Sequence, residues 1–298
     1  MGKYYICLEL GGTHLRLGIV AEDYSLVRFE KLPTKRLSDA EDKIGCLAEL
    51  LCPLINEAGK ENVIAVSMAL ASLMNKERSV IYSSPMVKGF DHIELKALLE
   101  KRLGLPVIME KDVNILLLYE IQKQSLPGEG IVAGVFLGTG LGNAICIDGR
   151  VYKGFSGAAC ELGHIPVSGL DARCGCGKAG CIEIKACGRL LDTLSKQFGC
   201  GVGDIFLLHG QRAEVRDVIY HFALAIATEV SILDPACVLL GGGILDMPGF
   251  PLEDLLNQVR AHVRAPNPRE TLRFAFSSGD SMAGVVGAAI HASQLMGK

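Results

Sequence analysis

Two segments of this chain repeat one pattern, in which an apolar strand, a glycine-rich turn and a second strand follow one another. Residues 4–20 read YYICLELGGTHLRLGIV, and residues 131–147 read IVAGVFLGTGLGNAICI. Two strands joined by a short Gly/Thr-rich turn are typical of a β-hairpin. Because the hairpin occurs twice, we predict a duplicated architecture in which each hairpin opens an α/β domain.

Further elements are predicted after each hairpin. The sequence Ser38-Asp-Ala-Glu41 is a capping box that predicts the start of a helix, which Pro53 should kink or end. Apolar spacing predicts helices at residues 93–103, 215–233 and 282–296, and a buried strand at 237–240. A chain of 298 residues suits two domains. We expect the first to be residues 1–113, completed by the C-terminal helix 284–298, and the second to be residues 114–283.

The composition narrows the function classes. The formal net charge is -3, only 21% of the residues are charged, and there is no long basic run. This balance does not favour nucleic-acid or membrane binding. The sequence has neither a signal-peptide pattern at its start nor an uninterrupted apolar stretch of about 18 residues. Three of its 11 cysteines lie in one cluster, and the other eight are scattered without a paired spacing, which is typical of a reducing compartment, so we expect a cytoplasmic protein.

A histidine and three cysteines lie within a short stretch of the second predicted domain. They are His164, Cys174, Cys176 and Cys181. A Cys3His set fills all four positions of a tetrahedral zinc ion, so such a site is structural rather than catalytic. Glycines at positions 175, 177 and 180 let the backbone turn tightly around an ion. The alternatives are buried free cysteines, or a zinc deaminase, whose H-x-E and P-C-x-x-C elements are both missing here.

Two glutamates flank this cluster. Glu161 comes three residues before His164, and Glu183 comes two residues after Cys181. Carboxylates accept hydrogen bonds from sugar hydroxyls, and a histidine can bind zinc through one ring nitrogen and donate from the other. We therefore expect Glu161, His164 and Glu183 to contact a ligand, although a solvated surface carboxylate is the alternative for each glutamate.

Three glycine-rich turns follow predicted strands. They are Gly11-Gly12-Thr13, Gly138-Thr139-Gly140-Leu141-Gly142 and Gly241-Gly242-Gly243. Backbone N–H groups of such turns can approach phosphate without hindrance from a Cβ atom. Neither hairpin turn fits a Walker loop or a dinucleotide fingerprint, and each could be an ordinary tight turn. Together, facing one cleft, the three turns predict a nucleotide site.

Asp112 follows a short strand that begins at Val107, at the start of a helix. Carboxylates at strand ends of α/β domains lie at clefts. In phosphoryl transfer an aspartate accepts the proton of the acceptor hydroxyl, which makes Asp112 the candidate catalytic base. The neighbouring Lys111 would favour the ionised carboxylate. The alternative is that Asp112 only caps the helix.

Taken together, the motifs resemble the ROK family (repressors, open reading frames and sugar kinases). The resemblance is carried by the glycine-rich turns above, by Glu-Lys-Asp-Val-Asn at 110–114, by Glu-Leu-Gly-His-Ile-Pro at 161–166 and by the cysteine run that ends at Glu183. Residues 240–251 further resemble the D-allose kinase branch.

The resemblance implies an actin-like ATPase (ribonuclease H-like) fold, with two α/β domains around a cleft that binds ATP and Mg²⁺. It also implies phosphorylation of a hexose hydroxyl, expected to be the 6-hydroxyl, and a homodimer. Asp112 matches the position of the family's catalytic base. Glu161, His164 and Glu183 match its sugar-binding positions, and His164 with the three cysteines matches its zinc ligands.

Three residues depart from the family pattern. Glu9 stands where the family usually has an aspartate near Mg²⁺ and phosphate, and its longer side chain could displace the metal. Lys111 replaces an asparagine that contacts the sugar, and Met86 replaces another sugar-binding asparagine. The sugar pocket is therefore expected to be altered.

Two other classes remain open from the sequence. ROK repressors share this body but carry a DNA-binding helix-turn-helix ahead of it, whereas here the first strand begins almost at Met1. A sugar-binding protein without kinase activity is the other alternative, because Glu9, Lys111 and Met86 all depart from the family pattern.

Overall fold

A computed structural model describes residues 2–84 and 89–297, which form two compact units. Within the described residues, unit 1 contains the chain up to Ser125, the segment Val151–Ala159 and the chain from Asp280 onward. Unit 2 consists of Leu126–Arg150 and Cys160–Gly279. Met86, at one of the predicted sugar positions, lies outside the described residues.

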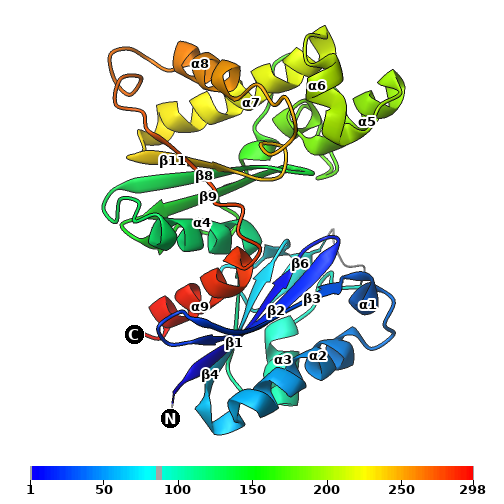
Figure 1. Cartoon of the computed structure of the whole chain (residues 1–298), viewed down its shortest axis with the longest axis vertical. Helices are drawn as coiled ribbons and strands as arrows, with labels where there is room; N and C mark the ends of the chain where they lie inside the picture. Colours follow the sequence, from blue (N-terminus) through cyan, green and yellow to red (C-terminus); the bar gives the residue numbers. More distant parts are fainter. Residues whose placement is uncertain (1, 85–88, 298) are drawn as a thin grey trace. The chain divides into compact units, whose positions relative to one another are not determined.

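Unit 1 is built on a five-stranded sheet of order β3-β2-β1-β4-β7 (Figure 1). The first hairpin supplies the antiparallel strands β1 and β2, and β4 and β7 continue the sheet in parallel. The strands of this sheet are β1 (Tyr4–Leu10), β2 (His14–Ala21), β3 (Leu26–Pro33), β4 (Val63–Leu70) and β7 (Val107–Lys111), and a separate pair is β5 (Leu73–Met74) and β6 (Ile81–Ser83). The helices are α1 (Lys35–Ser38), α2 (Lys43–Ala58), η1 (Lys60–Asn62), α3 (Leu95–Leu103), α4 (Asp112–Lys123) and α9 (Ala283–Leu295).

Successive side chains of the central strand β1 pack into two cores, one on each face of this sheet. Ile6 and Leu8 belong to the core formed with α2 and α3, whereas Tyr5 and Cys7 belong to the core formed with α9. Successive side chains of a strand point to opposite faces, so a strand between two helical layers is apolar on both. Figure 1 shows α2 and α3 on one face of the sheet and α9 on the other.

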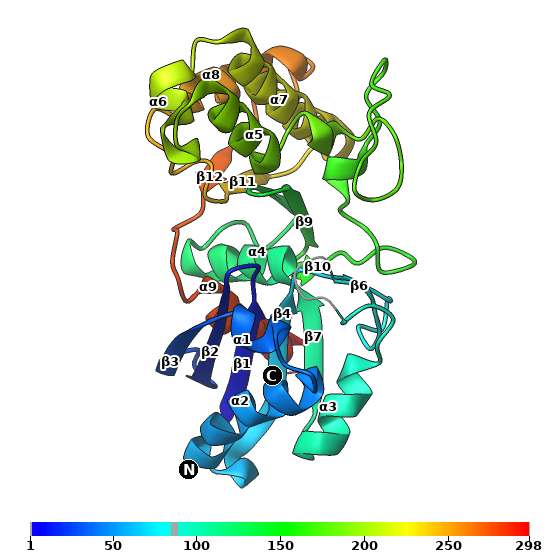
Figure 2. The same cartoon turned by 90° about the vertical axis from the view of Figure 1, so that its right-hand side faces the viewer.

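Unit 2 repeats this plan with a sheet of order β10-β9-β8-β11-β12. Its strands are β8 (Ile131–Leu137), β9 (Leu141–Ile147), β10 (Arg150–Val151), β11 (Cys237–Gly241) and β12 (Phe274–Phe276). Its helices are η2 (Leu162–His164), η3 (Ile182–Ile184), α5 (Gly188–Phe198), η4 (Val202–Asp204), α6 (Ile205–His209), α7 (Ala213–Leu233) and α8 (Leu252–His262). One core joins β8 and β11 to α5, α7 and α8, and Figure 2 shows these helices gathered together in this unit.

The predicted duplication is confirmed. In both sheets the first strand of the hairpin has the second hairpin strand on one side. On its other side it pairs in parallel with a strand from later in the chain. Unit 1 also contains α4, which the sequence analysis assigned to the second domain. The helix belongs there because it packs against α9, where a Cβ on Gly287 would lie 2.4 Å from the Ile115 carbonyl oxygen.

In unit 1 the predicted helix start was wrong, and of the two effects predicted for Pro53 the end of the helix does not occur, whereas the kink stays a prediction. The predicted capping box does not start α2, because Ser38 ends the short helix α1 and Asp42 is the N-cap, accepting a 2.7 Å hydrogen bond from the Gly45 N–H. Pro53 does not end α2, which continues to Ala58. Buried residues on both sides of Pro53, Leu51 and Leu54 among them, hold the helix against the sheet and offset the hydrogen bond that proline cannot make.

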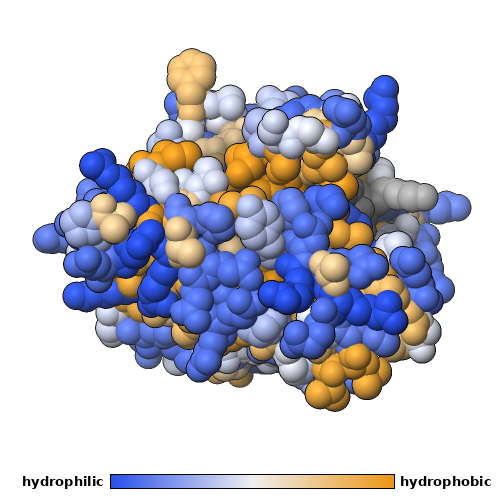
Figure 3. Space-filling view, turned by 90° about the horizontal axis from the view of Figure 1, so that it is seen from above, coloured by the Kyte–Doolittle hydropathy of each residue, from blue (hydrophilic) through white to orange (hydrophobic). Residues whose placement is uncertain are grey.

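The face drawn in Figure 3 is mostly hydrophilic and carries several hydrophobic areas. On unit 2 the exposed apolar side chains include Leu207 and Leu208 of α6 and Ile232 of α7. Single exposed apolar residues of this kind are normal on globular proteins. Among the described residues, none of the helices has the length and hydrophobicity needed to cross a membrane.

Candidate functional site

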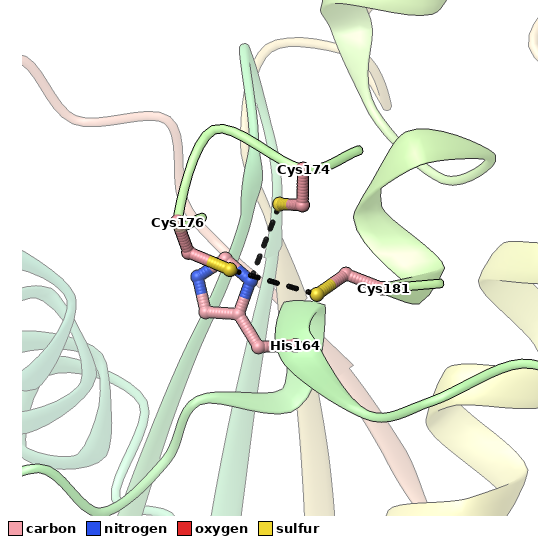
Figure 4. Close-up of side chains that lie close together, drawn as sticks. All are labelled: His164, Cys174, Cys176 and Cys181. Carbon is pink, nitrogen blue, oxygen red and sulfur yellow. Dashed lines mark hydrogen bonds between the residues drawn. The ribbon is translucent and has the colours of Figure 1, made fainter. Parts of the chain in front are cut away.

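The predicted metal ligands come together in unit 2. His164 ends η2, Cys181 precedes η3, and Cys174 and Cys176 lie on the loop between these elements. The four ligand atoms all lie within 4.8 Å of one another. Figure 4 shows the three sulfur atoms and the imidazole ring turned toward a common centre.

The distances fit a tetrahedral zinc ion. With Zn–S bonds of about 2.3 Å and a Zn–N bond of about 2.0 Å, neighbouring ligands of a tetrahedron are roughly 3.5–3.8 Å apart. Cys174 Sγ lies 3.7 Å from His164 Nδ1, and Cys176 Sγ lies 3.6 Å from Cys181 Sγ. The chemistry of the donor set and its spacing therefore both fit a closed structural site.

Glycine is needed at two of the three predicted positions in this loop. Gly177 and Gly180 have φ angles of 92° and 78°, which side chains rarely adopt. Gly175 has neither a positive φ nor any atom near its missing side chain, so the prediction for this glycine was wrong. The tight part of the loop lies after Cys176.

His164 is oriented by what surrounds its two ring nitrogens. Its Nδ1 faces Cys174, and its Nε2 lies 3.8 Å from Oε2 of Glu161. Glu161, at the N-cap of η2, has a partly exposed side chain. A carboxylate beside the second nitrogen of a metal-binding histidine fixes the ring orientation. The structure thus brings Glu161 next to His164, at the ring nitrogen that does not face Cys174.

Glu183 lies between the histidine segment and the glycine-rich turn that joins β8 to β9. Its Oε2 accepts a 3.0 Å hydrogen bond from the Leu141 N–H, and its Oε1 pairs with the Arg189 guanidinium. A Cβ on Gly140 would lie 2.6 Å from Oε2, and one on Gly163 would lie 3.3 Å from it. The carboxylate therefore contacts both segments, and Arg189 is a partner that the sequence analysis did not identify.

Two of the three glycine-rich turns lie side by side in unit 2. They follow the neighbouring strands β8 and β11, and the Ile244 N–H donates to the Leu137 carbonyl at 3.1 Å. Gly242 has a φ of 96°, and a Cβ there would lie 2.3 Å from the same carbonyl oxygen. Parallel strands end at one edge of a sheet, which is why these turns meet.

The third turn, Gly11-Gly12-Thr13, joins β1 to β2 in unit 1, close to Glu9. The Glu9 carboxylate lies 3.1 Å from Arg16 Nη1 and rests on the first turn of α9, where a Cβ on Gly284 would lie 2.4 Å from its Cδ. Burial raises the pKa of Glu9, Arg16 opposes this shift, and the negative charge of Asp112 adds to it. Gly284 thus leaves the room that the longer side chain of Glu9 needs.

Asp112 is the first residue of α4, directly after β7. The N-cap is Lys111, so Asp112 is not the cap, although its Oδ1 accepts a 2.9 Å hydrogen bond from the Val113 N–H. Burial raises the pKa of Asp112, while this hydrogen bond and the charge of Lys111 act in the opposite direction. Lys111 therefore favours the ionised form, as predicted, but burial outweighs it. The Lys111 ammonium also lies 3.4 Å from the Ala159 carbonyl oxygen.

A buried charge cluster supports the turn that carries Asp112, and the sequence analysis missed it. Glu110 is fully buried and pairs with Arg78 Nε at 2.7 Å and with Lys153 Nζ at 3.0 Å. Its Oε1 also accepts hydrogen bonds from the Lys111 N–H at 2.8 Å and from Asn114 Nδ2 at 2.9 Å. Because Arg78 and Lys153 are far from Glu110 in sequence, only the position of Glu110 two residues before Asp112 could have indicated the cluster.

With this geometry, the fold defines a class, the actin-like ATPase fold of two α/β units. The sequence profile of the ROK family matches residues 5–295. The chain therefore belongs to the ROK family.

Two curated relatives are similar over most of the chain. The glucokinase of Streptomyces coelicolor is 28% identical over 311 residues, covering 95% of this chain and 96% of the relative. The N-acetyl-D-glucosamine kinase of Photobacterium profundum is 30% identical over 260 residues, covering 80% and 84%. Among solved structures, a ROK family glucokinase from Streptomyces griseus in complex with glucose and AMPPNP matches with a TM-score of 0.78 and 27% identity, covering 98% of this chain and 99% of that one.

Proposed function

We propose that this protein is an ATP-dependent sugar kinase that phosphorylates a hexose hydroxyl, with the 6-hydroxyl as the first candidate. The main support from the structure is the position of Glu183, whose carboxylate contacts the His164 segment and the glycine-rich turn at 138–140. The proposed sugar-binding carboxylate and the proposed phosphate-binding turn are therefore neighbours within unit 2. A sugar kinase needs these two binding functions next to each other.

Asp112 is the proposed catalytic base. Its carboxylate accepts the proton of the attacking hydroxyl, and positioning with charge stabilisation supplies the rest of the rate enhancement. Burial raises the pKa of this group, which makes the carboxylate a stronger base than an exposed aspartate. Lys111, next to it, is proposed to contact the sugar.

The nucleotide is proposed to bind through backbone N–H groups of the three glycine-rich turns. They are Gly11-Gly12-Thr13, Gly138-Thr139-Gly140 and Gly241-Gly242-Gly243. Glu9 would hold Mg²⁺, because carboxylate oxygens are ligands that this ion prefers. The ion would neutralise charge on the transferred phosphoryl group. The absence of a side chain at Gly284 supports this role, because it leaves space for the Glu9 carboxylate close to the Gly11-Gly12-Thr13 turn.

Glu161, His164 and Glu183 are proposed to bind the sugar hydroxyls. Zinc held by His164, Cys174, Cys176 and Cys181 would supply structure, because four protein ligands leave no open position for chemistry. It would fix the His164 ring and, through it, the orientation of Glu161.

The acceptor is proposed to be a hexose. D-Allose is one candidate from the likeness of residues 240–251, and the relatives add glucose and N-acetyl-D-glucosamine. The test is ATP consumption by the purified chain with each of these sugars. Formation of a sugar phosphate with at least one of them is expected. A chain that consumes no ATP with any hexose or acetylated amino sugar would instead be a sugar-binding protein.

The role of Asp112 is tested with Asp112→Asn, which keeps the shape but removes the base. The expected loss in kcat is about 10²–10⁴-fold, with unchanged zinc content. Asp192→Asn is the matched control, since Asp192 pairs with Lys196 on the exposed face of α5. Undiminished turnover of Asp112→Asn would contradict the assignment.

A further inference from the structure

Arg189 is linked to the glycine-rich turn at 138–142 by two routes, directly through its backbone and indirectly through the Glu183 carboxylate. Arg189 is the second residue of α5, and its backbone N–H donates to the Thr139 carbonyl at 3.2 Å. Its guanidinium pairs with Glu183, which in turn accepts from the Leu141 N–H. The contacts close a ring that runs from Arg189 through Glu183, Leu141 and Thr139 back to Arg189.

The turn inside this ring is held tightly. The Gly188 N–H donates to the Gly138 carbonyl at 2.8 Å, and a Cβ on Gly188 would lie 2.7 Å from that oxygen. On the other side Gly140 leaves space for Glu183. A displacement of the Glu183 carboxylate therefore acts on the turn directly, through Leu141 and through the surface of Gly140.

The two ion-pair partners differ in exposure, and this decides which contact can change. The Glu183 side chain is 14% exposed, whereas that of Arg189 is 57% exposed. An ion pair with an exposed partner contributes little to stability, so a competing hydrogen bond can replace it at small cost. The hydrogen bond to the Leu141 N–H is part-buried, so it is the more persistent of the two contacts. A sugar hydroxyl that donates to Glu183 would thus compete mainly with Arg189.

Release of Arg189 would leave a cation beside the phosphate-binding turn. The Arg189 backbone is hydrogen-bonded to Thr139, so the guanidinium is never farther from the turn than the length of its own side chain. An arginine binds phosphate through several N–H donors in a planar fork. Among the described residues, Arg189 is the cation that pairs with Glu183.

We propose that Glu183 and Arg189 couple the sugar site to the nucleotide site: sugar binding to Glu183 frees Arg189, which then binds the nucleotide phosphates. Arg189 is a positioning residue for Glu183 and a nucleotide-binding residue once the sugar is present. This inference rests on the proposed function, since it takes Glu183 as a sugar ligand and the turn at 138–140 as a phosphate site.

The experiment measures the Kd of AMPPNP with and without a saturating sugar, using D-glucose, N-acetyl-D-glucosamine and D-allose in turn. In the wild-type chain the effective sugar is expected to tighten AMPPNP binding by about 5-fold or more, and AMPPNP should tighten sugar binding by the same factor. In Arg189→Gln the factor is expected to fall close to one, while AMPPNP still binds in the absence of sugar.

Two further variants make the result specific. Lys196→Gln removes one positive charge from the same helix at an exposed ion pair and should keep the wild-type factor. Arg189→Lys keeps the charge without the fork and should restore part of it. A structural role alone would lower both affinities without changing their ratio.

The outcomes separate the two hypotheses. If a sugar is phosphorylated and Arg189→Gln keeps the full coupling factor, the coupling role is wrong and the kinase assignment stands. If no sugar is phosphorylated and none changes the affinity for AMPPNP, both are wrong.

Discussion

Replacement of Glu110 by glutamine is predicted to destabilise unit 1 strongly. The change keeps the side-chain volume but removes the negative charge that faces Arg78 and Lys153, whose side chains are 4% and 24% exposed. In either of its two orientations, the glutamine amide would also place its N–H donors against one of the two cations, the Lys153 ammonium or the Arg78 guanidinium. Removing one partner of a buried ion pair costs about 3–5 kcal/mol, because the remaining charge stays desolvated.

The expected loss corresponds to a Tm lower by roughly 6–20 °C for a unit of this size. It is measured by thermal and denaturant unfolding followed by circular dichroism. Glu57→Gln is the control, because Glu57 pairs with Arg28 at an exposed position of the same unit and should cost at most about 1 kcal/mol. The double variant Glu110→Gln/Lys153→Met removes one of the stranded cations and should recover part of the loss. A Glu110→Gln protein as stable as Glu57→Gln would refute the reasoning.

Three other predictions concern the metal and the pH dependence of stability. Cys176→Ser should lower bound zinc, measured by mass spectrometry of metals, from near one ion per chain, whereas Cys52→Ser should not; a wild-type chain without zinc would overturn the site. Burial lowers the pKa of His291 from 6.5 to about 4, so the unfolded chain takes up the proton first, and stability should fall by about 3 kcal/mol as the pH drops from 6.5 to 4; His291→Phe should lack this dependence. Burial raises the pKa of Glu229 from 4.5 to about 7, so the folded chain holds this proton more tightly than the unfolded chain does. The contribution of Glu229 to stability is therefore lost as the pH rises from 4.5 to 7, and a Glu229→Gln protein with the pH dependence of the wild type would contradict this.

The elements with long apolar patterns could be predicted from the sequence. The two hairpins, the helix that became α7 and the strand before Gly241 are determined by local periodicity and turn residues, and the structure has them where expected. The start of α2 could not be predicted in this way, since Asp42 and Ser38 are both good capping residues and only packing selects between them. Whether α4 belongs with unit 1 depends on its contact with α9, which no local pattern encodes.

In the candidate site, too, some features could be predicted from the sequence and others depend on packing. The Cys3His cluster could be predicted because its ligands are close in sequence and of the types that zinc requires. The Glu110 cluster and the pair of Glu183 with Arg189 could not, because both depend on side chains that meet only after the strands and helices pack. For Asp112, the sign of the Lys111 effect follows from charge, whereas the larger effect of burial requires the folded chain.

Helix α9 has a consequence for how the chain is made. It forms the layer over β1 and β4, where Ser67 donates to the Ala288 carbonyl at 2.7 Å and Val285, Ala289 and Ala292 fill the core. A ribosome releases β1 and β4 before α9, so the first sheet emerges with the face that α9 covers still open. Unit 2 is complete before that face is closed, and a chain interrupted before Ala283 would leave the first sheet exposed to chaperones and proteases.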